Sequence, residues 1–185
     1  MQKRFYQYGM SALISVLLFV LLSCHKSAFE LQSYAFVHNE PIPEKYWHGD
    51  YSGRQNISIP FNWINPPVGT QSFALIMRET GTHNEIHWAV FNIPADCTSI
   101  SENASGNNMP AGSIELSNYR RTPGYFGPEP IRQIGTFEYM AVLYALNTAA
   151  IHDLNGYISY LDLCNIMDGN IIAKAEIVGT ALYKK

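Results

Sequence analysis

The chain has 185 residues, of which 47% are apolar and only 15% are charged, and its formal net charge is −3. The apolar content excludes an intrinsically disordered protein, and the length suits one domain of ordinary size. The net negative charge also excludes the basic footprint of a nucleic-acid-binding protein.

The first 23 residues have the pattern of an export signal. Lys3 and Arg4 supply a positive start, and the apolar run that follows covers residues 10–22. This run has the length of a signal-peptide core and is short for a helix that crosses a membrane. We therefore expect residues 1–23 to direct export. An ordinary cleaved secretory signal and an uncleaved anchor helix are the alternatives.

The signal ends in LLSC, which resembles the lipobox of bacterial lipoproteins. The resemblance implies that Cys24 becomes the lipidated first residue of an exported protein in the bacterial cell envelope. Several acyl chains on one cysteine hold a protein stably at a membrane surface. Residues 24–28 would then be a short tether, and residues 29–185 would form the domain.

Two further cysteines, Cys97 and Cys164, would be exported with the domain. An oxidising compartment permits a disulfide bond between them. Two separate buried thiols are the alternative, since the sequence does not show that the two side chains approach each other.

Three apolar segments with strand character follow along the chain. They are QSFALIMR at 71–78, HWAVFNI at 87–93 and TFEYMAVLYAL at 136–146. Segments rich in Pro and Gly separate them, which predicts loops between the strands.

The C-terminal part changes character. Apolar residues recur at near-helical spacing over 153–167, which predicts a helix. A break at 168–170 precedes IIAKAE at 171–176, a second predicted short helix, and 177–185 reads as a closing strand. Strands followed by a helical segment predict a mainly β fold, an antiparallel core with helices at one end.

An ordered series of motifs resembles the phosphatidylethanolamine-binding protein family, in particular its bacterial Raf-kinase-inhibitor-like branch. The motifs are NPPVGTQSFAL, HWAVFNIPA, GYFGPEP and YMAVLYAL, and the resemblance extends from about Phe29 to Tyr183. It implies an antiparallel β-sandwich-like core with a small second sheet and C-terminal helices.

Members of this family have a small pocket that binds anions such as phosphate or a phosphoethanolamine head group. The resemblance implies that His87, Tyr139, Gly127 and Pro128 line such a pocket. A neutral imidazole can donate one hydrogen bond to a phosphate oxygen, and glycine allows the backbone to come close to a ligand. In the alternative, His87 and Tyr139 are packing residues of the core.

The sequence departs from the family pattern at the expected pocket. Arg78, Glu79 and Thr80 stand where the family has D-P-D-x-P, and Phe137 replaces the histidine of H-R-Y. Arg78 would make the pocket more cationic and offer a bidentate donor to a phosphate. In the alternative, Arg78 is a solvated loop charge.

The segment THNEIHW groups His83, Glu85 and His87. On a strand, residues 85 and 87 would share a face. A zinc site needs three or four ligands, and no second cluster accompanies this one. The sequence therefore predicts no metal site and no cofactor.

No nucleophile signature is present, since the chain has no G-x-S-x-G and no cysteine beside a histidine. We therefore expect a lipid-anchored, non-catalytic binding protein for a small anionic ligand. The alternative is a protein-interaction or inhibitor module that uses the loop at 94–113.

Overall fold

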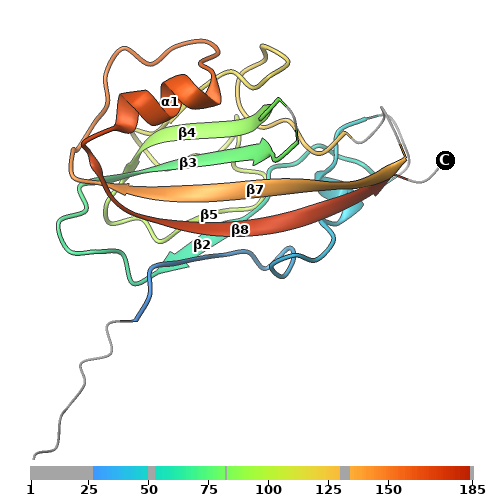
Figure 1. Ribbon diagram of the computed structural model, residues 1–185, viewed down its shortest axis with the longest axis horizontal. Coiled ribbons are helices and arrows are strands. Elements are labelled where there is room, and N and C mark those ends of the chain that lie inside the picture. Colours follow the sequence, from blue (N-terminus) through green and yellow to red (C-terminus); the bar gives the residue numbers. More distant parts are fainter. Residues whose placement is uncertain (1–26, 50–52, 82, 130–133, 184–185) are drawn as a thin grey trace, which may run out of the picture.

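The computed structural model describes residues 27–49, 53–81, 83–129 and 134–183. The export signal and Cys24 therefore lie outside the described residues. Two antiparallel sheets form the described part of the chain, one with strand order β6-β4-β3-β7-β8 and one with order β1-β2-β5 (Figure 1). The predicted class, mainly β with a small second sheet, is confirmed.

The five-stranded sheet is the centre of the molecule. Its strands are β3 (Ser72–Glu79), β4 (Ile86–Pro94), β6 (Ile114–Glu115), β7 (Gly135–Leu146) and β8 (Ile171–Tyr183). The three strands predicted from apolar patterning are all present. Both faces of β3 are covered, which explains why its sequence is a nearly unbroken apolar run.

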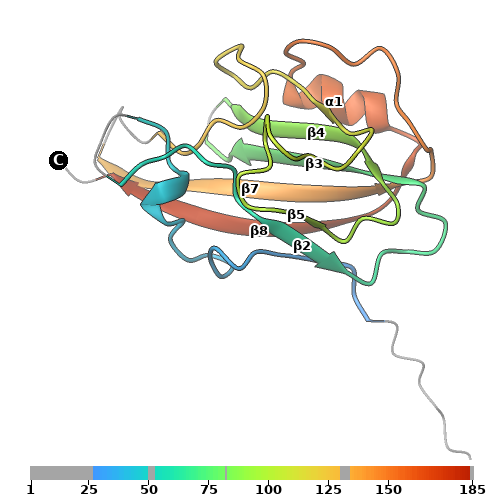
Figure 2. The same cartoon turned by 180° about the vertical axis from the view of Figure 1, so that it is seen from behind.

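The small sheet covers one face of the large sheet, which we call the inner face. It consists of β1 (Glu30–Gln32), β2 (Phe61–Ile64) and β5 (Ser99–Ile100), and a short 3-10 helix, η1, spans Glu44–Tyr46. Figure 2 shows β2 and β5 in front of the large sheet. Aromatic and aliphatic side chains from both sheets form the inner core between them.

Helix α1 (Tyr160–Met167) covers the opposite, outer face. Its Leu163 and Met167 are buried in an outer core with side chains of β3, β4 and β7. The helix begins where Ser159 accepts a hydrogen bond from the backbone N–H of Asp162, an N-cap that stabilises a helix start by about 1 kcal/mol. Within the described residues, no helix is long and apolar enough to cross a membrane.

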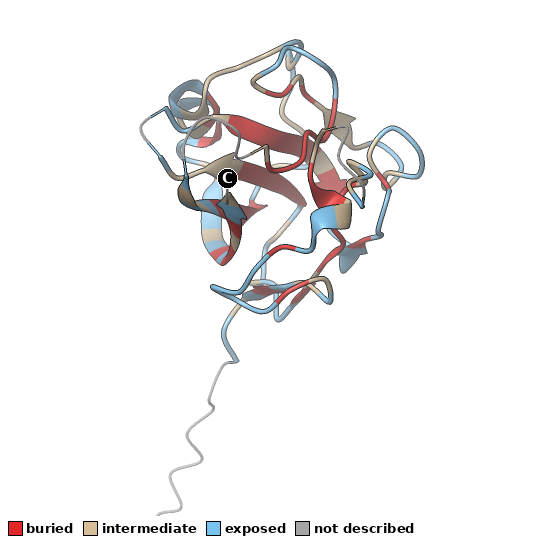
Figure 3. Cartoon of the chain, turned by 90° about the vertical axis from the view of Figure 1, so that its right-hand side faces the viewer, coloured by how far each residue is buried: buried red, intermediate tan, exposed pale blue. Residues whose placement is uncertain are grey.

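The predicted second helix at 171–176 is wrong, because these residues begin β8. Strand β8 pairs with β7 along its whole length, from Ile171 opposite Leu146 to Tyr183 opposite Gly135. Ala, Lys and Glu are good helix formers, but intrinsic helix propensity is small per residue, and tertiary pairing overrides it. Figure 3 shows buried stretches on the central strands, and both buried and exposed stretches along the loops around them.

The two described cysteines are free thiols. Cys97 packs against the inner core, whereas Cys164 belongs to α1 on the outer face. The disulfide considered from the sequence is therefore not formed in this structure, since the sheet lies between the two elements.

Candidate ligand-binding site

A β-bulge at the start of β4 turns His87 toward the inner face. Pairing with β3 is regular from Leu75 opposite Val90 to Met77 opposite Trp88, and it resumes with Arg78 opposite Ile86. His87 is therefore an extra residue, and a bulge of this kind re-aims a side chain. Trp88 lies in the inner core and the His87 ring contacts that core too, so two successive side chains face inward.

A buried hydrogen bond fixes which ring nitrogen of His87 carries the hydrogen. Nδ1 lies 2.7 Å from the carbonyl oxygen of Phe126. Because a carbonyl can only accept, Nδ1 is the protonated nitrogen and Nε2 carries the lone pair. His87 is 1% exposed, and its Nε2 has no hydrogen-bond partner among the described residues. An acceptor without a donor therefore lies buried at this position.

The imidazole of His87 is neutral at neutral pH. Burial lowers its pKa to about 4, and the backbone groups of Phe126 and Gly127 and the charge of Glu129 offset this only in part. The single N–H of the neutral ring is already given to Phe126. His87 therefore does not offer a phosphate the hydrogen bond that the sequence suggested.

Aromatic rings surround His87. Tyr139 meets it edge to face with ring centroids 4.9 Å apart, and Tyr119 lies at the same distance on a tilted plane. Burial raises the pKa of Tyr139 well above its ordinary value, so its hydroxyl stays protonated. The expected neighbourhood of His87 and Tyr139 is thus present, and Tyr139 also belongs to the inner core.

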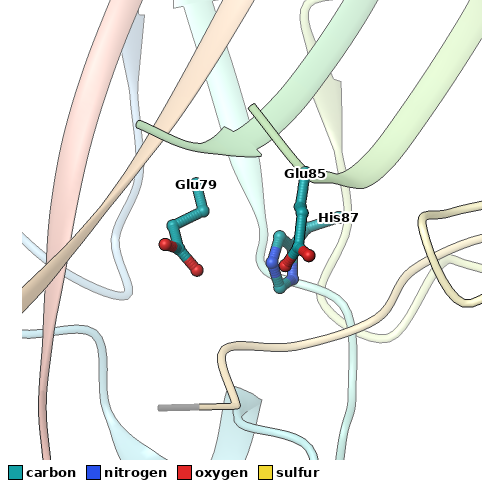
Figure 4. Close-up of side chains that lie close together, drawn as sticks. All are labelled: Glu79, Glu85 and His87. Atoms are coloured by element: carbon teal, nitrogen blue, oxygen red, sulfur yellow. The ribbon is translucent and has the colours of Figure 1, made fainter. Parts of the chain in front are cut away.

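Two carboxylates complete the site. Glu79 ends β3 opposite Tyr139 of β7, and Glu85 immediately precedes β4. One ligand atom from each of Glu79, Glu85 and His87 lies within 4.8 Å of the others (Figure 4). The backbone N–H of Glu79 donates to the carbonyl of Glu85 at 3.0 Å, which holds the two chain segments together.

Sequence analysis did not predict Glu79 as a site residue, although strand alternation carried the signal. Leu75 and Met77 face the inner core, so the residue two positions further on β3 faces inward as well. Arg78 lies between Met77 and Glu79 on the strand, so its side chain points to the outer face.

Arg78 does not line the site. Its guanidinium lies 4.6 Å from the ring centroid of Tyr160 in α1, and its terminal nitrogens donate to Asn84 and to the sulfur of Met140. These contacts belong to the outer face of the sheet. The predicted placement of Arg78 as a cationic pocket residue is therefore wrong.

Gly127 and Pro128 brace the site instead of offering space to a ligand. A Cβ at Gly127 would lie 2.0 Å from the carbonyl oxygen of Tyr46, so the close approach is between two backbone segments. The carbonyl of Pro128 accepts the N–H of His48 at 3.0 Å. This contact fixes the segment whose Phe126 carbonyl orients His87.

A further charge pair stands near the site. The guanidinium of Arg120 donates to the carboxylate of Glu129, and both charges act on His87. Glu79, Glu85 and Glu129 thus place three carboxylates near His87, and the guanidinium of Arg120 is paired with Glu129.

A cavity of about 450 Å³ lies elsewhere, lined by residues 31–33, 36–38 and 176–177. Its His38 already accepts the backbone N–H of Val178 through Nδ1. The unmet acceptor of His87 makes the site between the end of β3 and the start of β4 the stronger candidate, because buried polar atoms without partners are rare and call for an explanation.

Comparison with known proteins assigns a family. The profile of the family described as "Phosphatidylethanolamine-binding protein" matches residues 32–183. A UPF0098 protein of the archaeon Methanothermobacter thermautotrophicus is 34% identical over 158 residues, which cover 84% of this chain and 98% of that protein. LppC of Mycobacterium tuberculosis, provisionally named a lipoprotein, is 29% identical over 116 residues, 62% of this chain and 53% of LppC.

Two crystal structures share the fold. One is CT736 from Chlamydia trachomatis, provisionally described as a phosphatidylethanolamine-binding protein homologue, with a TM-score of 0.71 and 29% identity over 85% of this chain and 98% of that one. The other is YbcL from Escherichia coli, with a TM-score of 0.77 and 24% identity over 85% of this chain and all of YbcL, 100%.

Proposed function

This chain belongs to the phosphatidylethanolamine-binding protein family, and we propose that it is a lipid-anchored, non-catalytic binding protein for a small phosphate-bearing ligand of the phosphoethanolamine type. The ligand lies at the site formed by Glu79, Glu85 and His87. Its amine, and not only its phosphate, is what this site recognises.

The buried lone pair of His87 Nε2 is the observation that supports this proposal most strongly. An acceptor needs a donor, and two carboxylates lie beside it. An ammonium group brings three N–H donors and a positive charge, so it complements all three side chains. An inorganic phosphate dianion brings only one hydroxyl donor, and its negative charge meets carboxylates of the same sign.

Tyr139 supports the phosphate half of the ligand. Its ring packs edge to face on His87, and burial keeps its hydroxyl protonated by raising its pKa. A protonated hydroxyl can donate to a phosphate oxygen. The side chains named at the described site are phenols, carboxylates and one imidazole.

The start of the described domain and the site lie at opposite ends of the sheet. Phe29, just after the proposed tether, stacks near Phe73 at the start of β3, whereas Glu79 ends that strand (Figure 1). The strand separates them by roughly 20 Å. A chain lipidated at Cys24 would thus present the site away from its own membrane, and the resemblance to LppC supports the lipoprotein assignment.

Calorimetric titration of the full-length protein in a maltoside detergent, after treatment with a chelator, tests the proposal. Phosphoethanolamine and ethanolamine are expected to bind measurably, and inorganic phosphate more weakly than either. Glu79→Gln keeps the shape of the side chain and removes the charge. We expect it to weaken ethanolamine binding about tenfold, the value of one charge-assisted hydrogen bond.

Glu138→Gln is the matched control. Glu138 lies on β7 beside Tyr139, is exposed, and accepts a hydrogen bond from Thr80. It makes the same change in net charge without touching His87, so binding should be unchanged. Absence of binding by the unmodified protein would overturn the proposal, as would phosphate binding that tightens in Glu79→Gln.

A further inference from the structure

We propose that Glu79, Glu85 and His87 also form a binding site for one divalent transition-metal ion of the Zn²⁺ class. The inference goes beyond the proposed head-group binding, although both use the same three side chains. It rests on two observations, the group of three ligand atoms and the buried ring nitrogen that has no partner in the described structure.

The environment of His87 is that of a metal-binding histidine. Such a histidine coordinates through one ring nitrogen and donates the other N–H to a carbonyl or carboxylate, which fixes the tautomer. Nδ1 of His87 meets the Phe126 carbonyl at 2.7 Å, so Nε2 presents its lone pair. An acidic cluster alone is common on protein surfaces. A buried imidazole lone pair at the same point is not.

The three ligands come from three positions that the fold fixes separately. Glu79 ends β3, Glu85 precedes β4, and the bulge of β4 presents His87. Their ligand atoms lie within 4.8 Å of one another. Metal bonds of about 2.1 Å need ligand atoms roughly 3.4 Å apart, so a pair of ligand atoms at the 4.8 Å limit has to close by about 1.4 Å. Side-chain rotation of a half-buried glutamate supplies this movement.

The donor set selects the metal. One imidazole nitrogen with two carboxylates suits Zn²⁺, Mn²⁺, Fe²⁺ or Co²⁺. Mg²⁺ and Ca²⁺ prefer oxygen ligands throughout, and Cu⁺ prefers sulfur. Three protein ligands leave at least one position open on such an ion. A phosphate oxygen can take this position, so a bound ion would reverse the preference of the site from amine to phosphate.

The test uses tag-free full-length protein that has been stripped of metal. Zn²⁺ is titrated calorimetrically in a non-coordinating buffer, and Co²⁺ is titrated while its visible absorption is recorded. We expect one ion per chain. Glu79→Gln and Glu85→Gln should each weaken Zn²⁺ binding by at least about tenfold. Substitution of a residue that only hydrogen-bonds to a metal ligand already has an effect of this size.

Glu138→Gln again serves as the control and should bind Zn²⁺ like the unmodified protein. Because His87 is buried, His87→Gln is informative only if the variant is folded, and the two glutamate variants do not depend on it. Saturable binding that Glu79→Gln and Glu85→Gln leave unchanged would place the ion elsewhere and overturn the inference. Absence of saturable binding would overturn it as well.

Failure of this inference and failure of the proposed function are distinguishable. Zn²⁺ binding is measured with no phosphate or amine present, and ethanolamine binding is measured without metal. If both ligands bind, Zn²⁺ should displace ethanolamine, since they compete for His87 Nε2. Simultaneous binding of both would contradict the shared site.

Discussion

Arg78 and Glu79 are the last two residues of β3, and they point to opposite faces of the sheet. The two side chains have very different surroundings. On the outer face, Arg78 lies on the ring of Tyr160 and donates to Asn84 and Met140. Only its Nε lacks a partner among the described residues. On the inner face, Glu79 approaches Glu85 and a buried imidazole whose lone pair is unmet.

This difference indicates a packing role for Arg78 and a binding role for Glu79. The charge of Arg78 is used within the fold, where it joins α1 to the sheet. The inner face brings together two carboxylates and a lone-pair nitrogen, groups that all accept hydrogen bonds and that complement a positively charged ligand. A buried nitrogen without a hydrogen-bond partner lowers the stability of the fold, and natural proteins accept this loss of stability mainly at functional sites.

The largest expected effect is that of Gly127→Ala, which tests whether the backbone contact behind His87 is required. The new Cβ would lie 2.0 Å from the carbonyl oxygen of Tyr46. Backbone has to move, so the free energy of unfolding should fall by about 3 kcal/mol or more, at the upper end of overpacking effects. Urea unfolding measures it.

Gly106→Ala is the comparison for that variant. Gly106 has a positive φ of 68°, but a Cβ there meets no atom within 4 Å. We expect a loss of only about 1 kcal/mol from backbone strain. Equal losses in the two variants would contradict the proposed tight contact.

Acid should destabilise the metal-free protein because the buried His87 resists protonation in the folded state. The pKa of His87 is lowered from 6.5 to about 4 by burial. Between these values the unfolded chain binds the proton and the folded chain does not, so stability is complete above pH 6.5 and falls as the pH drops toward 4. The total loss attributable to His87 is about 3 kcal/mol.

Comparison with His87→Phe isolates this contribution. The variant keeps a buried aromatic ring and removes the titrating group, whereas other acidic and basic groups are unchanged. Its stability should depend less steeply on pH between 6.5 and 4 than that of the unmodified protein. Parallel profiles, measured by thermal unfolding with a chelator present, would show that His87 is not buried in its neutral form.

The smallest expected effect distinguishes the two faces most cleanly. Arg78→Met removes the contact with Tyr160 and the hydrogen bond to Asn84, and should lower the free energy of unfolding by about 1 kcal/mol. Ethanolamine binding should not change. Glu79→Gln should do the opposite, with weaker binding and little change in stability. An effect of Arg78→Met on ethanolamine binding would show that Arg78 contributes to the site after all.

The sequence predicted the fold well wherever apolar patterning was strong. The segments at 71–78, 87–93 and 136–146 became β3, β4 and β7 with small changes of boundary. The error at 171–176 has a physical cause. Ala, Lys and Glu have helical propensity, but pairing with β7 extends β8 to Ile171, and no local pattern reveals that partner.

The site was predicted less completely, because it depends on which strands pair and on which face of its strand each residue lies. His87 and Tyr139 were expected together and are in contact. Arg78 was expected in the site and Glu79 was not, since a shift of one residue along a strand exchanges its faces. The sequence showed Glu85 near His87, but Glu79 joins them only because the end of β3 lies beside the start of β4.

The most direct test of the binding account is the ¹⁵N chemical shift of each ring nitrogen of His87 at neutral pH, assigned with His87→Phe. We predict a protonated Nδ1 and an unprotonated Nε2, and a shift of Nε2 when ethanolamine is added to the metal-free protein. A ring protonated at Nε2, or an Nε2 signal that saturating ethanolamine does not move, would contradict the account.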